Sequence, residues 1–116
     1  VEASASARKI SAALRHTRLT AIRTREPQVL VFDLEARTVA APGRAPEKLP
    51  DSVTLKLFTA TAEVRSDKEA GIRFFPDGGS TGGRVAIAVG EREWQVRVGW
   101  LTGDIDLKDS ARERLQ

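Results

Sequence analysis

The spacing of the apolar residues changes at Pro27, and this change constrains the fold more than any other feature of the sequence. Before Pro27, small or apolar residues recur three and four positions apart, which places them on one face of a helix. Leu19 and Ile22 broaden this stripe. Because proline disfavours helix at the residue before it, we expect one long helix over residues 3–25. The residues expected to pack this helix on the rest of the domain are Ile10, Leu14 and Ala21.

After Pro27 the apolar residues alternate with polar ones, which is the spacing of strands that bury one face. Leu30 and Phe32 lie in the first of these runs, and Trp94 and Trp100 lie in the cleanest one. We take these four side chains as core candidates. Truncating a buried tryptophan to alanine typically costs about 3–5 kcal/mol, so either tryptophan change is expected to threaten the fold. The expected strands cover residues 28–34, 37–40, 53–57, 61–65, 72–75, 85–89 and 94–100.

One helix followed by closely spaced strands predicts an α+β domain, in which a long N-terminal helix packs on antiparallel β-sheet. Two sheets in a sandwich are favoured over one curved sheet, because the strands carry enough apolar faces to bury one sheet against another. The 116 residues suffice for one domain and are too few for two. We expect a stem helix at 3–25, a β domain at 28–107, and a charged C-terminal tail at 108–116 that would fit a frayed helix.

The composition argues against an enzyme. Apolar residues make up 41% of the chain and charged residues 30%, a balance typical of soluble globular proteins. The chain has no cysteine, which excludes disulfides and thiolate metal sites. It has a single histidine, His16, which leaves few ways to build a catalytic triad. We therefore expect no catalytic residue, cofactor or metal ion. The chain begins at Val1 and contains no methionine, so we also expect it to be a piece of a longer protein.

Three weaker patterns point to chemistry, and each has a plainer structural interpretation. The glycine-rich run 78–84 lacks the lysine and the following helix of a phosphate loop, so a mobile hairpin connection is favoured, in which Gly82 and Gly83 tolerate alanine. A nucleophilic Ser80 or Thr81 would need His16 as its base. Three carboxylates near the C-terminus, Asp104, Asp106 and Asp109, carry oxygen ligands of the kind that calcium binds. An exposed acidic end of the chain is favoured over a calcium site.

The helix segment is strongly basic. The first 25 residues carry a net charge of +5, against −2 for the remainder of the chain. Arg15, Arg18 and Arg25 could follow a nucleic-acid backbone, although no exposed aromatic residues interleave with them for base stacking. A solvated helix face is the common outcome for such a pattern. A third hypothesis is packing beside other helices, with the arginines facing carboxylates or lipid head groups and small residues such as Ala3, Ala7, Ala13 and Ala21 permitting close approach.

The central block of the sequence resembles one family specifically. Four parts of this block are similar to the H-type minor pseudopilins of the bacterial type II secretion system (GspH). They are the runs 72–78, 80–84 and 100–103, and the strand residues Trp94, Val96 and Val98. The helix phrase 13–22 and the strand 29–34 fit the same family, so the likeness runs from about residue 10 to residue 105. The family motif includes Phe74, Phe75, Pro76, Asp77, Gly78, Ser80, Thr81, Gly82 and Gly83, which we call the motif loop.

The resemblance implies a pilin-like fold and a role in assembly. It implies the periplasmic domain of a protein anchored in the bacterial inner membrane, with the anchoring helix outside this sequence. It further implies a non-enzymatic subunit near the tip of the pseudopilus, with the I-, J- and K-type minor pseudopilins and the major pseudopilin as partners, and exoproteins as further candidates. The alternative is a type IV minor pilin of the same family that binds DNA through the basic helix face.

Overall fold

The structure, a computed structural model, describes residues 2–109 of the chain. It begins with helix α1 (Glu2–Thr24), which ends one residue before the expected boundary. Arg25 follows with a positive φ of 61° and leads the chain toward Pro27. The remaining elements are β1 (Gln28–Asp33), β2 (Thr38–Ala40), β3 (Glu47–Lys48), β4 (Thr54–Thr59), the 3-10 helix η1 (Thr61–Glu63), β5 (Glu69–Phe74), β6 (Gly83–Val89), β7 (Arg92–Val98) and β8 (Ile105–Asp109).

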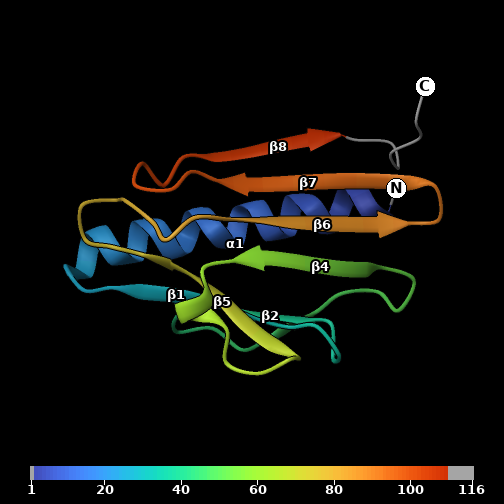
Figure 1. The fold of residues 1–116 in the computed structure, drawn as a ribbon, viewed down its shortest axis with the longest axis horizontal. Helices are drawn as coiled ribbons and strands as arrows, with labels where there is room; N and C mark the ends of the chain where they lie inside the picture. Colours follow the sequence, from blue (N-terminus) through green and yellow to red (C-terminus); the bar gives the residue numbers. More distant parts are fainter. Residues whose placement is uncertain (1, 110–116) are drawn as a thin grey trace.

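The strands form two antiparallel sheets of four strands each, in the orders β3-β2-β1-β5 and β4-β6-β7-β8. Leu30 pairs with Ile72 in the first sheet, and Ile87 pairs with Trp94 in the second. Helix α1 contacts strands of both sheets and runs lengthwise behind the second one (Figure 1). The expected α+β fold with a helix packed on two antiparallel sheets is therefore confirmed.

The helix buries one face, and the buried residues are those that recur at spacings of three and four. Ile10, Leu14 and Ala21 are at most 1% exposed, and all three belong to the single core that the helix shares with both sheets. Two threonines on this side satisfy their hydroxyls within the helix, since Thr17 Oγ1 donates to the carbonyl of Ala13 at 2.8 Å. Thr20 Oγ1 donates to the carbonyl of His16 in the same way, at 2.8 Å.

The expected width of the helix stripe was wrong. Leu19 is 58% exposed and Ile22 is 39% exposed, so both lie outside the buried face of the helix. Ala3, Ala7 and Ala21, expected to let a partner helix approach, are instead buried inside the domain. They let the helix lie close to its own sheets.

The strands supply the other half of the core. Leu30 and Phe32 are fully buried, as are Phe74 on β5 and Val96 on β7. Trp94 is half-buried and packs against this core. Trp100 is 71% exposed, so its assignment to the core was wrong. The reason is local: β7 ends at Val98, and the amide of Gly103 donates to the carbonyl of Gly99, so the alternation stops two residues earlier than its pattern predicts.

Three segments differ from their predicted structure. Residues 61–65, predicted as a strand, begin with η1, and only Val64 forms a single bridge to Ala70. The proline-rich segment 41–50, where no strand was expected, contains the short strand β3. Lys108 and Asp109 belong to β8 and not to a tail. The rest of the predicted C-terminal tail, residues 110–116, lies outside the described residues.

Candidate functional site

The motif loop is a tightly bonded structure. The amide of Gly78 donates to the carbonyl of Phe75 at 2.8 Å, which closes the turn that the sequence Phe75-Pro76-Asp77-Gly78 predicts. Asp77 Oδ1 accepts from the amide of Gly79 at 2.8 Å, and the Phe75 amide donates to the Gly79 carbonyl at 2.8 Å. The expectation of a mobile connection was therefore wrong, because the loop uses its backbone groups and short side chains to bond to itself.

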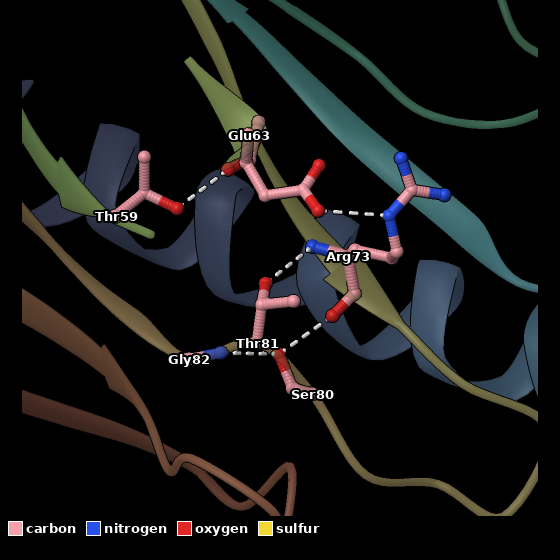
Figure 2. Close-up of polar contacts among 7 residues, drawn as sticks. Thr59, Glu63, Arg73, Ser80, Thr81 and Gly82 are labelled. Carbon is pink, nitrogen blue, oxygen red and sulfur yellow. Dashed lines mark hydrogen bonds and ion pairs between the residues drawn. The ribbon is translucent and has the colours of Figure 1, made fainter. Parts of the chain in front are cut away.

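Both hydroxyls of the loop are bonded to the backbone beside them. Ser80 Oγ donates to the carbonyl of Arg73 at 2.7 Å and accepts from the amide of Gly82 at 2.9 Å (Figure 2). Thr81 Oγ1 accepts from the amide of Arg73 at 3.2 Å. The structure does not bring His16 to these hydroxyls, since its Nε2 lies 3.5 Å from the carbonyl oxygen of Pro42. Ser80 is 2% exposed, so its hydroxyl holds the loop and does not face a substrate.

An ion pair lies beside these hydroxyls. Arg73 Nε on β5 donates to Glu63 Oε2 at 2.9 Å, and the Glu63 side chain is only 8% exposed (Figure 2). Sequence reasoning missed this pair, because Glu63 was assigned to a strand. A buried carboxylate requires a partner, so the pair fixes η1 on β5.

A second turn, residues 99–104 between β7 and β8, packs against the motif loop, and glycines make the close approach possible. The amide of Leu101 donates to the carbonyl of Ser80 at 3.1 Å. A Cβ added at Gly82 would meet the Cα of Trp100 at 3.1 Å, and Gly82 has a φ of +79°. Gly103, with a φ of +74°, would place a Cβ on the carbonyl oxygen of Gly78. The two turns therefore form one packed unit.

The helix is tied to this unit by one of the candidate nucleic-acid residues. Arg18 Nε donates to the carbonyl of Gly78 at 2.9 Å. Arg15 bonds to Ser11 within the helix at 2.5 Å, and Arg25 follows the helix end. Of the three arginines named for nucleic-acid contact, Arg18 therefore has a structural contact that the sequence did not predict.

The acidic residues near the C-terminus do not gather. Asp109 pairs with Arg92 at 2.8 Å, and Asp106 lies opposite Arg97 in the β7–β8 register. Within residues 2–109, no group of three or more histidine, aspartate or glutamate residues is arranged to hold a metal ion. Asp104 instead lines a hollow beside the helix.

The model of one protein family matches the chain over residues 6–103, and its description is "Type II transport protein GspH". The chain therefore belongs to the GspH family of type II secretion minor pseudopilins. GspH proteins are structural subunits and not enzymes, in agreement with the expectation from the composition. The match includes the motif loop and most of the turn 99–104, so the packed unit described above lies inside the family's own region.

A curated relative supports the same assignment. The "Type II secretion system protein H" of Xanthomonas campestris pv. campestris is 41% identical over 97 residues, which are 83% of this chain and 57% of the relative. The chain thus spans little more than half the length of that GspH protein. None of the helices in residues 2–109 has the length and hydropathy needed to cross a membrane.

Solved structures show the pilin-like fold. The minor pseudopilin EpsH of Vibrio cholerae superposes with a TM-score of 0.70 at 16% identity, covering 94% of this chain and 98% of EpsH. The type IV minor pilin FimU of Pseudomonas aeruginosa matches in two crystal forms with TM-scores of 0.59 and 0.61 at 19% identity, covering 90% and 92% of this chain and 91% and 88% of FimU. At these identities the likeness concerns the fold alone.

Proposed function

We propose that this chain is the periplasmic domain of a minor pseudopilin that stands near the tip of the pseudopilus and helps drive folded exoproteins through the outer-membrane secretin. The observation that carries the proposal is the GspH family match over residues 6–103. The chemistry of the fold agrees with it: Ser80, Thr81 and Glu63 all bond within the domain, which suits a subunit that acts by contact.

The proposed setting is the bacterial inner membrane, with this single domain in the periplasm and an anchoring helix preceding α1. In that arrangement α1 is the outer half of a longer stem. The proposed partners are the I-, J- and K-type minor pseudopilins and the major pseudopilin. Exoproteins are the further candidates for contact, because a subunit near the tip would meet them first.

Complementation of a secretion defect tests this function. The gene is deleted in its own host, and secreted exoproteins are assayed separately in the medium and in the periplasm. We expect the exoproteins to accumulate in the periplasm and the intact gene to restore their release. A matched gene carrying Leu14→Arg, which places a charge at a fully buried position, should fail to restore it. Normal secretion in the deleted strain would overturn the proposal.

The second candidate is a type IV minor pilin that binds DNA, and the observation that favours it is the basic face of α1. Of the three arginines expected to contact nucleic acid, Arg15 and Arg25 are exposed, and neither has an ion-pair partner within residues 2–109. This function predicts duplex binding that weakens steeply as salt is raised and that Arg15→Ala reduces. Absence of binding at low salt would reject it.

A further inference from the structure

Two large apolar side chains project from the turn between β7 and β8. Trp100 is 71% exposed and Leu101 is 63% exposed. Leu101 also has a φ of 74°, a left-handed conformation that a branched side chain adopts only at a cost. The backbone at Leu101 is therefore strained in the conformation that leaves its side chain exposed.

The turn that displays them is rigid. Its backbone is bonded to the motif loop through the Leu101 amide and the Ser80 carbonyl, and Gly82 allows the Trp100 backbone to approach closely. An exposed tryptophan on a rigid backbone loses little conformational entropy when a partner covers it. Tryptophan and arginine are the residues that most often dominate the binding energy of protein interfaces.

A hollow of about 210 Å³ adjoins the same turn. It is lined on the helix side by Arg15, Arg18 and Leu19, and on the turn side by Gly103, Asp104 and Ile105. Leu19 is 58% exposed, so the helix side of the hollow also presents apolar surface. In Figure 1 the β7–β8 turn lies at the same end of the molecule as the C-terminal half of α1. We call the surface made by Arg15, Arg18, Leu19, Trp100 and Leu101 the Trp100 face.

The charges on this face define its partner. Within residues 2–109 no carboxylate lies within ion-pair distance of Arg15 or Arg18, so both keep their positive charge unpaired. Asp104 lines the same hollow, so two positive charges and one negative charge lie there. A second copy of this chain would present the same net positive charge, and like charges across an interface oppose association. A surface with carboxylates around an apolar cleft would satisfy both the charges and the exposed tryptophan.

We propose that the Trp100 face is the docking surface for a different pseudopilin of the same filament, which offers an apolar cleft for Trp100 and Leu101 and carboxylates for Arg15 and Arg18. This inference rests on the proposed function and specifies the surface and the chemistry of the partner. It also explains why the motif loop is so tightly built: the loop is the base on which the turn 99–104 is held.

Binding to the other pseudopilins tests the inference. The probes are the separately purified periplasmic domains of the other pseudopilins of the same secretion system, titrated against the 116-residue chain by calorimetry. We expect one of them to bind, Trp100→Ala to weaken that binding at least about tenfold, and Arg15→Glu to weaken it and flatten its salt dependence. The matched controls are Phe58→Ala, an aromatic side chain 49% exposed on β4, and Lys56→Glu, an equal change of charge on the same strand.

Each other outcome has a definite meaning. If the wild-type chain binds a pseudopilin and Trp100→Ala binds equally well, the docking surface lies elsewhere and the proposed function stands. If the wild-type chain binds none of them, the inference fails, and the secretion assay decides the proposed function separately. Two results would assign the face to another partner and overturn the inference. One is self-association that Trp100→Ala abolishes. The other is binding of a DNA duplex that Arg15→Glu abolishes, while no pseudopilin binds.

A substitution at Leu101 separates binding from folding. Leu101→Gly removes the side chain and relieves the left-handed strain at a φ of 74°, so the melting temperature should rise while pseudopilin binding weakens. Opposite changes in the two measurements cannot arise from partial unfolding. Binding equal to that of the wild-type chain would show that Leu101 takes no part in docking and would count against the proposed surface.

Discussion

The Nε of Arg18 on helix α1 donates a hydrogen bond of 2.9 Å to the carbonyl oxygen of Gly78, a residue 60 positions further along the chain. A Cβ at Gly103 would collide with the same carbonyl oxygen, so three segments meet there without room for another atom. This junction joins the helix, the motif loop and the turn 99–104.

Arg18→Ala should destabilise the domain by about 1–2 kcal/mol, because it leaves the Gly78 carbonyl without its charged donor. Thermal unfolding monitored by circular dichroism measures the effect. The control is Arg23→Ala, because Arg23 is an exposed arginine of the same helix whose side chain has no hydrogen bond or ion pair to residues 2–109. This change should alter stability by less than about 0.5 kcal/mol. Equal effects of the two substitutions would show that the Arg18–Gly78 contact does not hold the helix to the loop.

Gly82→Ala should cost about 2 kcal/mol or more, since alanine at a φ of +79° is strained and its Cβ would press on the Trp100 backbone. Gly43→Ala separates the two causes, because Gly43 has a φ of +73° and open space around it, so only the strain of about 1 kcal/mol applies. Denaturant unfolding of both variants gives the comparison. If Gly82→Ala is no worse than Gly43→Ala, the close packing of the two turns contributes nothing.

Arg73→Met should destabilise the domain by about 2 kcal/mol, because it leaves the carboxylate of Glu63 buried without its partner. We place the cost below that of a fully buried pair because 35% of the Arg73 side chain is exposed to water. The double variant Arg73→Met with Glu63→Gln should recover part of the loss, as chemical denaturation of both variants would reveal. Lys48→Met, which breaks the exposed pair with Asp51, should lower stability far less than Arg73→Met does, because water screens an exposed ion pair. A comparable loss there would argue against burial as the cause.

The hydrogen bond from Lys48, and then its positive charge, hold the pKa of the Asp51 carboxyl below its ordinary value of 3.8. Because the folded-state pKa is lowered, the small stabilisation from this pair is present above the ordinary pKa and disappears as the pH falls through the lowered one. In Lys48→Ala the pKa of Asp51 should rise toward its ordinary value, which an NMR titration of the carboxyl carbon can follow. An unchanged pKa would assign the shift to other charges, such as Arg37.

Local pattern was sufficient to predict most of the elements. The three-and-four spacing up to Ala21, followed by Pro27, predicted a helix that differs from α1 by one residue at each end. Alternation around Phe32 and Val96 predicted strands with the correct faces buried. These features depend on neighbours within a few positions, so a single sequence contains them. The family motif is also a short run of residues, and for the same reason the sequence was enough to indicate the GspH family.

Contacts between distant segments decided the rest. Trp100 continues the alternation of β7 in the sequence, yet the turn that begins at Gly99 turns it outward to solvent. Gly82 looked like part of a flexible connection, and only the backbone of Trp100 beside it explains why glycine is needed. The sequence by itself determined the long helix and the longer strands, because their periodicity follows from local backbone geometry. The tertiary structure alone decided how the two turns and Arg18 meet, because that depends on which surfaces lie within a few ångströms after folding.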